Sequence, residues 1–256
     1  MMIKSKGKRA FYFHSFFFIM ETQAFFTESR DILDAHHDRR ERIIKVSRDI
    51  TAQSKKMIFA LHRAVQGNKK YKEVDQKQAE ILNLFKKLSE DIQGTNYHRY
   101  SRSFSGGFEE FIEAVAFYHF ILHKQVITKE QINNYFKDEQ GKMWIQVKHE
   151  DYILGLADFT GELMRHAIQI VSSGKHEEAL DICILLRKID LDFEVVATLY
   201  MPQLNKKLGA LKSSIKKVEQ AVYNFKLRGS EYPREMYLSI IKNHQEQEQS
   251  QEQIEY

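Results

Sequence analysis

The chain has 256 residues, a mass of 30.4 kDa and a formal charge of +4, with only two prolines and 11 glycines. This composition excludes a turn-rich β fold and favours long helices around a good core, and the mildly basic charge is compatible with nucleic acid without being diagnostic of it. The single cysteine, Cys183, excludes a disulfide framework and indicates a reducing compartment.

Residues 1–26 are expected to form a tail outside the folded domain. A basic cluster at residues 4–9 precedes an apolar run at residues 10–20, an order that resembles the start of a signal peptide. Polar residues interrupt the run, no small-residue cleavage site follows it, and it is too short to cross a membrane. We interpret the segment as a disordered tail or an extension upstream of Met20, with a weak nuclear-import candidate in its basic cluster.

Residues 27–243 are expected to form one all-α, seven-helix domain, because apolar residues recur at helical spacing along most of this stretch. The expected helices cover residues 28–65, 72–93, 96–124, 128–136, 150–172, 176–190 and 202–227. A further short helix is expected to begin near Pro233, and the Gln/Glu-rich residues 244–256 are expected to form a frayed tail.

Local signals support several of these boundaries. Thr128 and Gln131 form a capping box at the start of the fourth helix. Pro202 is placed in the first turn of the seventh helix. The third helix is apolar on every side near its end, which predicts a buried helix whose segment Phe117–Ile121 needs a partner surface.

Two of the expected helices carry pairs of carboxylates within apolar sequence. Glu110 and Glu113 stand three residues apart, and Asp158 and Glu162 stand four apart, so each pair shares a helical face. Ionised carboxylates are rarely buried unless they are paired or coordinate a metal. An oxygen-only ligand set suits Mg²⁺ or Mn²⁺, which predicts a divalent cation where the two faces meet.

A structural role is the alternative for the same acids. Because charged pairs at this spacing are common on helices, Asp158 or Glu162 could pair with Arg165 or another basic residue. Gly155 leaves room beside the acids, and Gly161 allows a neighbouring helix to approach closely. Spacing alone does not decide between a metal site and a solvated face.

A basic and aromatic segment, residues 96–107, precedes the first pair of acids. It carries His98, Tyr100 and Arg102, and such side chains commonly hold single-stranded RNA by gripping phosphates and stacking on bases. The alternative is a solvated helix start. A lysine-rich strip at residues 206–217 is likewise typical of a solvated face.

Four sequence blocks resemble the translin superfamily, and within it the branch of translin-associated factor X. The blocks are residues 36–63, 109–121, 151–165 and 211–233, and the likeness covers about residues 25–237. The resemblance implies an all-α, seven-helix protomer that joins a translin homologue in a closed hetero-octamer. The segment between the fourth helix and Trp144 is shorter than in the family members considered.

The resemblance also implies an activity, a Mg²⁺-dependent endoribonuclease with Mn²⁺ as an alternative cofactor. Its substrate would be single-stranded or nicked small RNA, including the passenger strand in RNA silencing, with single-stranded DNA as a further candidate. We expect a nuclear and cytoplasmic protein without a membrane association. The family motifs fall on the catalytic candidates Glu110, Glu113 and Asp158, the metal-binding candidates Glu113, Asp158 and Glu162, and the RNA-binding candidates His98, Tyr100 and Arg102.

Two other functions compete with this interpretation. In the first, the chain is a non-catalytic RNA-binding or scaffolding partner of translin, and the acids stabilise helix packing. In the second, the chain is a di-iron carboxylate bundle, which needs Glu-x-x-His pairs. The residues three places after Glu113 and Glu162 are Ala116 and Arg165, so the di-iron ligand set is incomplete.

Overall fold

The computed structural model describes residues 6–67, 70–196 and 201–228, which are helical almost throughout. The described helices are α1 (Lys6–Gly67), α2 (Lys72–Asp91), α3 (Asn96–Arg99), α4 (Ser101–His123), α5 (Lys129–Asn134), α6 (His149–Ser172), α7 (His176–Glu194) and α8 (Pro202–Arg228). Within these ranges the β structure amounts to one isolated bridge, between Lys137 and Met143. The predicted all-α class is therefore confirmed.

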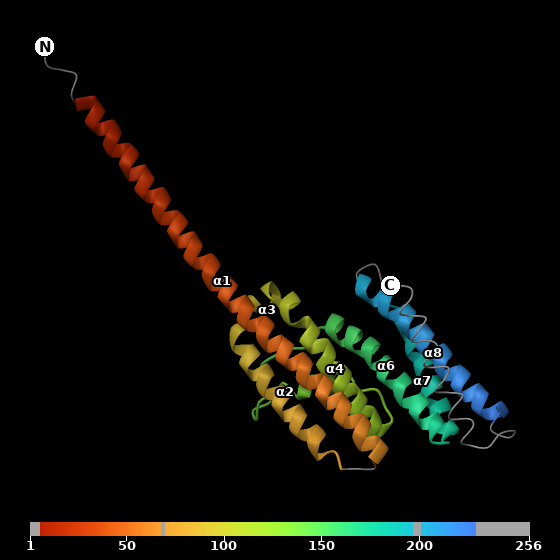
Figure 1. Cartoon of the computed structure of the whole chain (residues 1–256). Helices are drawn as coiled ribbons and strands as arrows, with labels where there is room; N and C mark the ends of the chain where they lie inside the picture. Colours follow the sequence, from red (N-terminus) through yellow and green to blue (C-terminus); the bar gives the residue numbers. More distant parts are fainter. Residues whose placement is uncertain (1–5, 68–69, 197–200, 229–256) are drawn as a thin grey trace.

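The long helices form a layered bundle, shown in Figure 1. The C-terminal half of α1 packs against α2 and α4, α6 packs against the next side of α4, and α7 and α8 pack against α6. The N-terminal part of α1 extends beyond the bundle as a single projecting helix. No helix in the described part of the chain combines the length and the apolar character that crossing a membrane requires.

An aromatic cluster fills the core between α2, α4 and the segment after α5. The ring centroid of Phe85 lies 4.6 Å from that of Phe108, 5.1 Å from that of Phe111 and 5.1 Å from that of Phe136. All four side chains are fully buried. Because each buried phenylalanine contributes about 1.5–3 kcal/mol relative to an exposed one, this cluster fixes α4 firmly against α2.

Several boundary signals in the sequence are confirmed. The Thr128 hydroxyl accepts a hydrogen bond from the Gln131 backbone amide at 3.2 Å, and the Thr128 amide donates to Gln131 Oε1 at 2.7 Å. These two bonds are the predicted capping box. Pro202 begins α8 as expected, and Cys183 is buried in the core at 5% exposure.

Other predicted boundaries are wrong. The first helix was expected to begin at residue 28, but α1 begins at Lys6 because no glycine or proline interrupts residues 8–66. The predicted third helix is divided at Tyr100, where φ is −103° and ψ is 7°, so α3 and α4 replace it and the described helices number eight. The helix predicted near Pro233 and the tail at 244–256 lie outside the described residues.

The predicted partner surface on the third helix is also wrong. Phe117 and Phe120 are 0% and 3% exposed because α1 and α6 cover them within the same chain. The exposed apolar side chains of the bundle include instead Ile184 and Leu191 on α7 and Val195 directly after it, at 59%, 63% and 87% exposure.

Gly155 sets the distance between α4 and α6. A Cβ atom at this position would lie 2.7 Å from Ile112 Cβ and 2.9 Å from the Glu109 carbonyl oxygen, closer than real Cβ atoms approach. The helices therefore contact backbone to backbone where the acid faces begin. The close approach predicted at Gly161 is wrong, since a Cβ there would meet no atom within 4 Å.

We expect Gly155→Ala to destabilise the fold by about 1–3 kcal/mol, because the added methyl group must push α4 and α6 apart. Gly161→Ala is the matched control in the same helix. It should be neutral or stabilise by up to about 1 kcal/mol, because alanine favours helix and meets no neighbour. Chemical denaturation of both variants measures the difference, and equal effects would contradict the close contact at Gly155.

Candidate functional site

The four predicted acids lie where α4 and α6 face each other, flanked by α1 and α8. Glu110 and Glu113 project from α4, and Asp158 and Glu162 project from α6. The side chains of Glu110, Asp158 and Glu162 are only 23%, 33% and 18% exposed. The packing of α4 on α6 therefore brings acids that are about 50 residues apart in sequence into one partly buried region.

Glu113 stands at the centre of this region. Burial removes water from its carboxylate, and the charges of Asp158, Glu110 and Glu162 add to the effect, so its pKa rises to about 8. Among the described residues Glu113 has no ion-pair or hydrogen-bond partner. Burial likewise raises the pKa of Glu110. Glu113 is therefore the acid that holds a proton, or requires a cation, near neutral pH.

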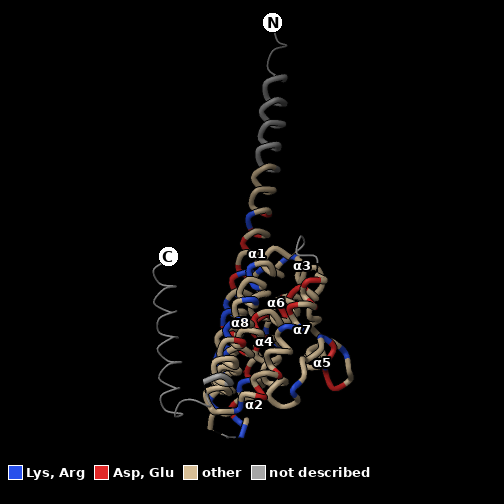
Figure 2. Tube along the Cα trace, turned by 90° about the vertical axis from the view of Figure 1, so that its right-hand side faces the viewer, with Lys and Arg blue, Asp and Glu red and all other residues tan. Residues whose placement is uncertain are grey.

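Lys207 joins α8 to this region. Its ammonium group donates to Asp158 Oδ2 at 2.6 Å, to Glu109 Oε2 at 2.9 Å and to the Leu154 carbonyl oxygen at 3.2 Å. Burial alone would lower the pKa of Lys207, but the bonds to Asp158 and Glu109 outweigh it and raise the pKa. Figure 2 shows Lys and Arg positions gathered on the side of the bundle where α1 and α8 are labelled.

Helix α1 supplies two further partners. Lys55 Nζ lies 3.2 Å from Glu110 Oε1, and His62 Nε2 is hydrogen-bonded to Glu162 Oε2. Arg165, the partner expected from sequence, lies 4.0 Å from Glu162 at the limit of an ion pair. Three of the four acids are thus paired, but chiefly with residues that are distant in sequence.

The donor set suits a hard divalent cation, although it is not arranged around one. All four acids offer carboxylate oxygens, and Glu113 lacks a counter-ion, which is the chemistry that Mg²⁺ or Mn²⁺ binding requires. Within the described ranges no group of three or more His, Cys, Asp or Glu side chains stands ready to hold a metal ion. Cation binding would therefore require Lys207 or Lys55 to release its acid.

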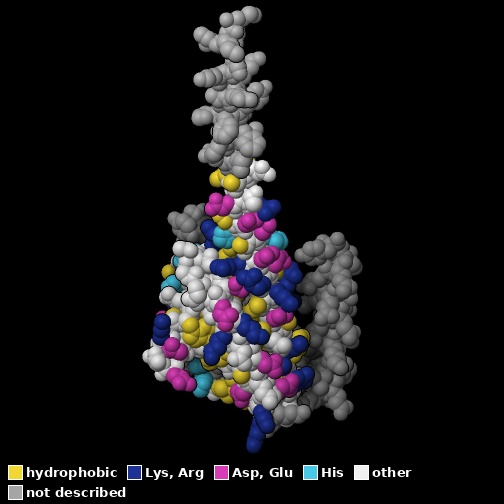
Figure 3. All heavy atoms as spheres, turned by 90° about the vertical axis from the view of Figure 1, so that its left-hand side faces the viewer, with side chains coloured by type: hydrophobic (Ala, Val, Ile, Leu, Met, Phe, Trp, Pro, Cys, Tyr) yellow, Lys and Arg dark blue, Asp and Glu magenta, His cyan; other side chains and the backbone are white. Residues whose placement is uncertain are grey.

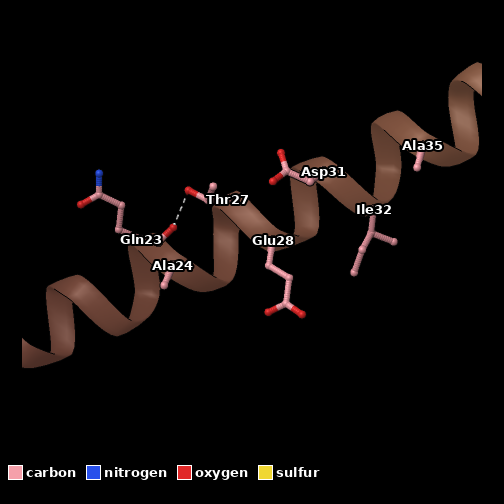
Figure 4. Close-up of a pocket in the computed structure, with 7 residues that line it drawn as sticks. All are labelled: Gln23, Ala24, Thr27, Glu28, Asp31, Ile32 and Ala35. Carbon is pink, nitrogen blue, oxygen red and sulfur yellow. Dashed lines mark hydrogen bonds between the residues drawn. The ribbon is translucent and has the colours of Figure 1, made fainter.

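A small cavity of about 140 Å³ borders Asp158 on the α8 side. Lys207 also lines it, together with Thr160, Gly161, Ser214 and the apolar residues Ala157, Ala210 and Leu211. A larger space of about 760 Å³ lies along α1 between Gln23 and Ala35. Figure 4 shows that the side chains around that space project in different directions from one helix, so they do not enclose a site.

The predicted RNA-binding residues separate into two groups. His98 on α3 and Arg102 on α4 are exposed. Tyr100 is only 5% exposed, and its hydroxyl lies 2.6 Å from His36 Nδ1 on α1. The ring of Tyr100 is therefore packed at the junction of α3 and α4, and its contact with RNA stays a prediction.

Sequence reasoning missed the residues that surround the acids. Lys207 was interpreted as part of a solvated strip, and Lys55 and His62 carried no signal because their partners lie 55 and 100 residues away. Asp151, in the first turn of α6, is a further acid near this region; it is 3% exposed, and burial raises its pKa to about 6. The adjacent glutamates 109 and 110 were the one available clue to these basic partners. In the structure Glu109 pairs with Lys207, and Glu110 pairs with Lys55.

We expect Glu113→Gln to gain stability relative to the wild type as the pH rises from 5 to 8 in metal-free buffer. The folded pKa of about 8 lies above the ordinary value of 4.5, so the wild type loses stability as the pH rises through this window. Glutamine does not ionise, and the difference should grow by up to about 1.4 kcal/mol per pH unit. Denaturant unfolding at several pH values measures it. Glu139→Gln, in an exposed loop, is the control for charge removal, and parallel curves for Glu113→Gln and the wild type would contradict the raised pKa of Glu113.

Comparison with known proteins supports the same fold and family. Residues 38–229 match the Translin family. A relative called translin-associated protein X from Rattus norvegicus is 33% identical over 231 residues, which cover 82% of this chain and 80% of that protein. The translin-associated protein X homolog of Schizosaccharomyces pombe is 28% identical over 211 residues, covering 79% of this chain and 87% of that protein.

Solved structures show the same architecture. A structure described as an AfC3PO–duplex RNA complex superposes with a TM-score of 0.64 at 22% identity, covering 80% of this chain and 98% of that one. The structure of apo-NeC3PO has a TM-score of 0.62 at 21% identity, covering 76% and 93%. At these identities the likeness concerns the fold alone. The family match and the relative at 33% identity together show that this chain belongs to the translin family.

Proposed function

We propose that this chain is the catalytic subunit of a Mg²⁺-dependent endoribonuclease that assembles with a translin homologue. Its substrates would be single-stranded or nicked small RNA, including passenger strands in RNA silencing. The observation that carries the proposal is Glu113, a partly buried acid without an ion-pair partner among the described residues, surrounded by three other acids. A protein gains nothing in stability from such an arrangement, which a divalent cation would resolve.

The four acids have different roles in the proposed site. Glu113 and Glu162 hold the cation, and Asp158 and Glu110 complete the ligand set or orient the attacking water. When bound, Mg²⁺ supplies charge stabilisation for the phosphate and lowers the pKa of a water molecule. Lys207 Nζ lies 2.6 Å from Asp158 Oδ2 in the metal-free structure and would release this carboxylate when the cation binds.

The RNA backbone approaches along the start of α4. Arg102 is exposed and stands eight residues before Glu110, which is about 12 Å along the helix. His98 is exposed on the neighbouring α3. On the face of the molecule shown in Figure 3, Lys, Arg and His side chains lie over α1 below its projecting part, interspersed with Asp and Glu side chains. These cations suit a phosphate chain, and single-stranded DNA offers the same phosphates.

The relatives support the partner and the substrate class. One relative is named for its association with translin, and human translin is itself 23% identical to this chain over 217 residues. One structural neighbour was solved with duplex RNA. We therefore propose a translin homologue as partner and RNA as ligand, in the cytoplasm and nucleus.

A second function is favoured by one observation. Lys207, Lys55 and His62 already pair three of the four acids. Such pairing would also be expected if the acids only join α1, α4, α6 and α8 in a non-catalytic RNA-binding scaffold. The two functions differ in what happens when a single acid loses its charge.

In the complex with its translin homologue, Glu113→Gln and Asp158→Asn should each reduce single-stranded RNA cleavage by at least about 100-fold. The reason is that each removes a proposed cation ligand while preserving the shape of the side chain. Cleavage of a labelled RNA is measured with Mg²⁺ and with EDTA, and size-exclusion chromatography monitors assembly.

Glu150→Gln is the matched control, because Glu150 is an exposed acid in the first turn of the same α6 helix. It should leave cleavage unchanged. Full activity in Glu113→Gln or Asp158→Asn would refute the assignment of the site. Absence of cleavage in the wild-type complex, with RNA binding retained, would favour the scaffold.

A further inference from the structure

His62 is a polar residue buried in the body of the bundle. It lies in the last turns of α1 and is only 5% exposed. Its Nε2 is hydrogen-bonded to Glu162 Oε2 on α6. Its ring also packs against Phe117 on α4, with ring centroids 4.7 Å apart. A single side chain of α1 therefore touches both helices that carry the acids.

These contacts restrict the carboxylate of Glu162. Phe117 follows Glu113 by one helical turn, so both residues lie on the same face of α4. The His62 ring, which packs against Phe117, therefore rests on the face of α4 that carries Glu113. The hydrogen bond occupies Oε2 of Glu162, and Oε1 has no hydrogen-bond partner among the described residues. A flexible glutamate side chain is thus held by one oxygen while its other oxygen remains available.

We propose that His62 is a positioning residue that orients Glu162 for cation binding. The proposal rests on the proposed function, because it assumes that Glu162 is a ligand. The hydrogen bond to Oε2 restricts the rotation of the Glu162 side chain before the cation binds. Less conformational entropy is then lost on binding. Hydrogen bonds of this kind behind a metal ligand typically change affinity by about 10–100-fold. Because His62 is buried, its contribution is made through Glu162 and not through the RNA.

His166 provides an internal comparison. It is also buried, at 3% exposure, and its ring centroid lies 5.8 Å from that of the same Phe117. Neither of its ring nitrogens has a hydrogen-bond partner in the described part of the chain. His166 therefore shares the residue type, the burial and the aromatic neighbour of His62, and lacks the bond to an acid.

The test measures Mn²⁺ affinity of the assembled complex by electron paramagnetic resonance, without RNA. His62→Phe should weaken binding by about 10–100-fold, and His62→Gln should bind within a few-fold of the wild type because its amide can still donate to Glu162. His166→Phe should bind as the wild type does. In cleavage assays, His62→Phe should need more Mg²⁺ and recover most of its rate at saturating Mg²⁺.

Unchanged Mn²⁺ affinity in His62→Phe, or an equal loss in His166→Phe, would overturn the inference and leave the proposed function standing. A wild-type complex that binds no Mn²⁺ would overturn both. If His62→Phe does not assemble, the Mn²⁺ affinities of His62→Gln and His62→Met are compared instead. The two side chains are similar in length, and only glutamine has an N–H donor. Equal Mn²⁺ affinity in those two variants would then contradict the role of the hydrogen bond.

Discussion

The contact between α4 and α6 at Gly155 determines the rest of the site. Only a residue without a Cβ atom lets the backbone of α6 lie against Ile112 and the Glu109 carbonyl. At this separation the acids on the two helices share one partly buried region, and water is largely removed from Glu113. A wider spacing would expose the same acids to solvent, where their mutual repulsion would be weak.

The structure resolves the electrostatic conflict among these acids only in part. Lys207 from α8 and Lys55 and His62 from α1 each contact one acid or more, so α1 and α8 are attached to the α4–α6 pair partly through charge. Glu113 is left with a pKa raised to about 8. Uncompensated burial of this kind is costly to a fold and is commonly found at functional sites.

Much of the fold could be predicted from local sequence patterns. Helical periodicity, the capping box at Thr128 and the start of α8 at Pro202 depend on neighbouring residues, and the structure agrees with all three. The packing of Tyr100 could not be predicted in this way, because the tyrosine hydroxyl contacts His36, 64 residues away. Its role in RNA binding stays a prediction.

The candidate site could be predicted less completely than the fold. Spacing identified the acids and their faces, since residues on one helix have fixed relative positions. It could not identify Lys207 or His62, whose partners lie 49 and 100 residues away along the chain. Whether a lysine is solvated or forms a buried ion pair depends on which helices pack together, and periodicity within one helix does not contain that information.

The most direct test of the account is a crystal structure of the complex soaked in Mn²⁺, with an anomalous difference map. The account predicts one strong peak per copy of this chain, bounded by Glu113, Asp158 and Glu162, with oxygen ligands at about 2.0–2.3 Å and with Lys207 displaced from Asp158. A map without a peak between α4 and α6, with Lys207 still bound to Asp158 at a saturating Mn²⁺ concentration, would contradict the central claim that these acids form a cation site.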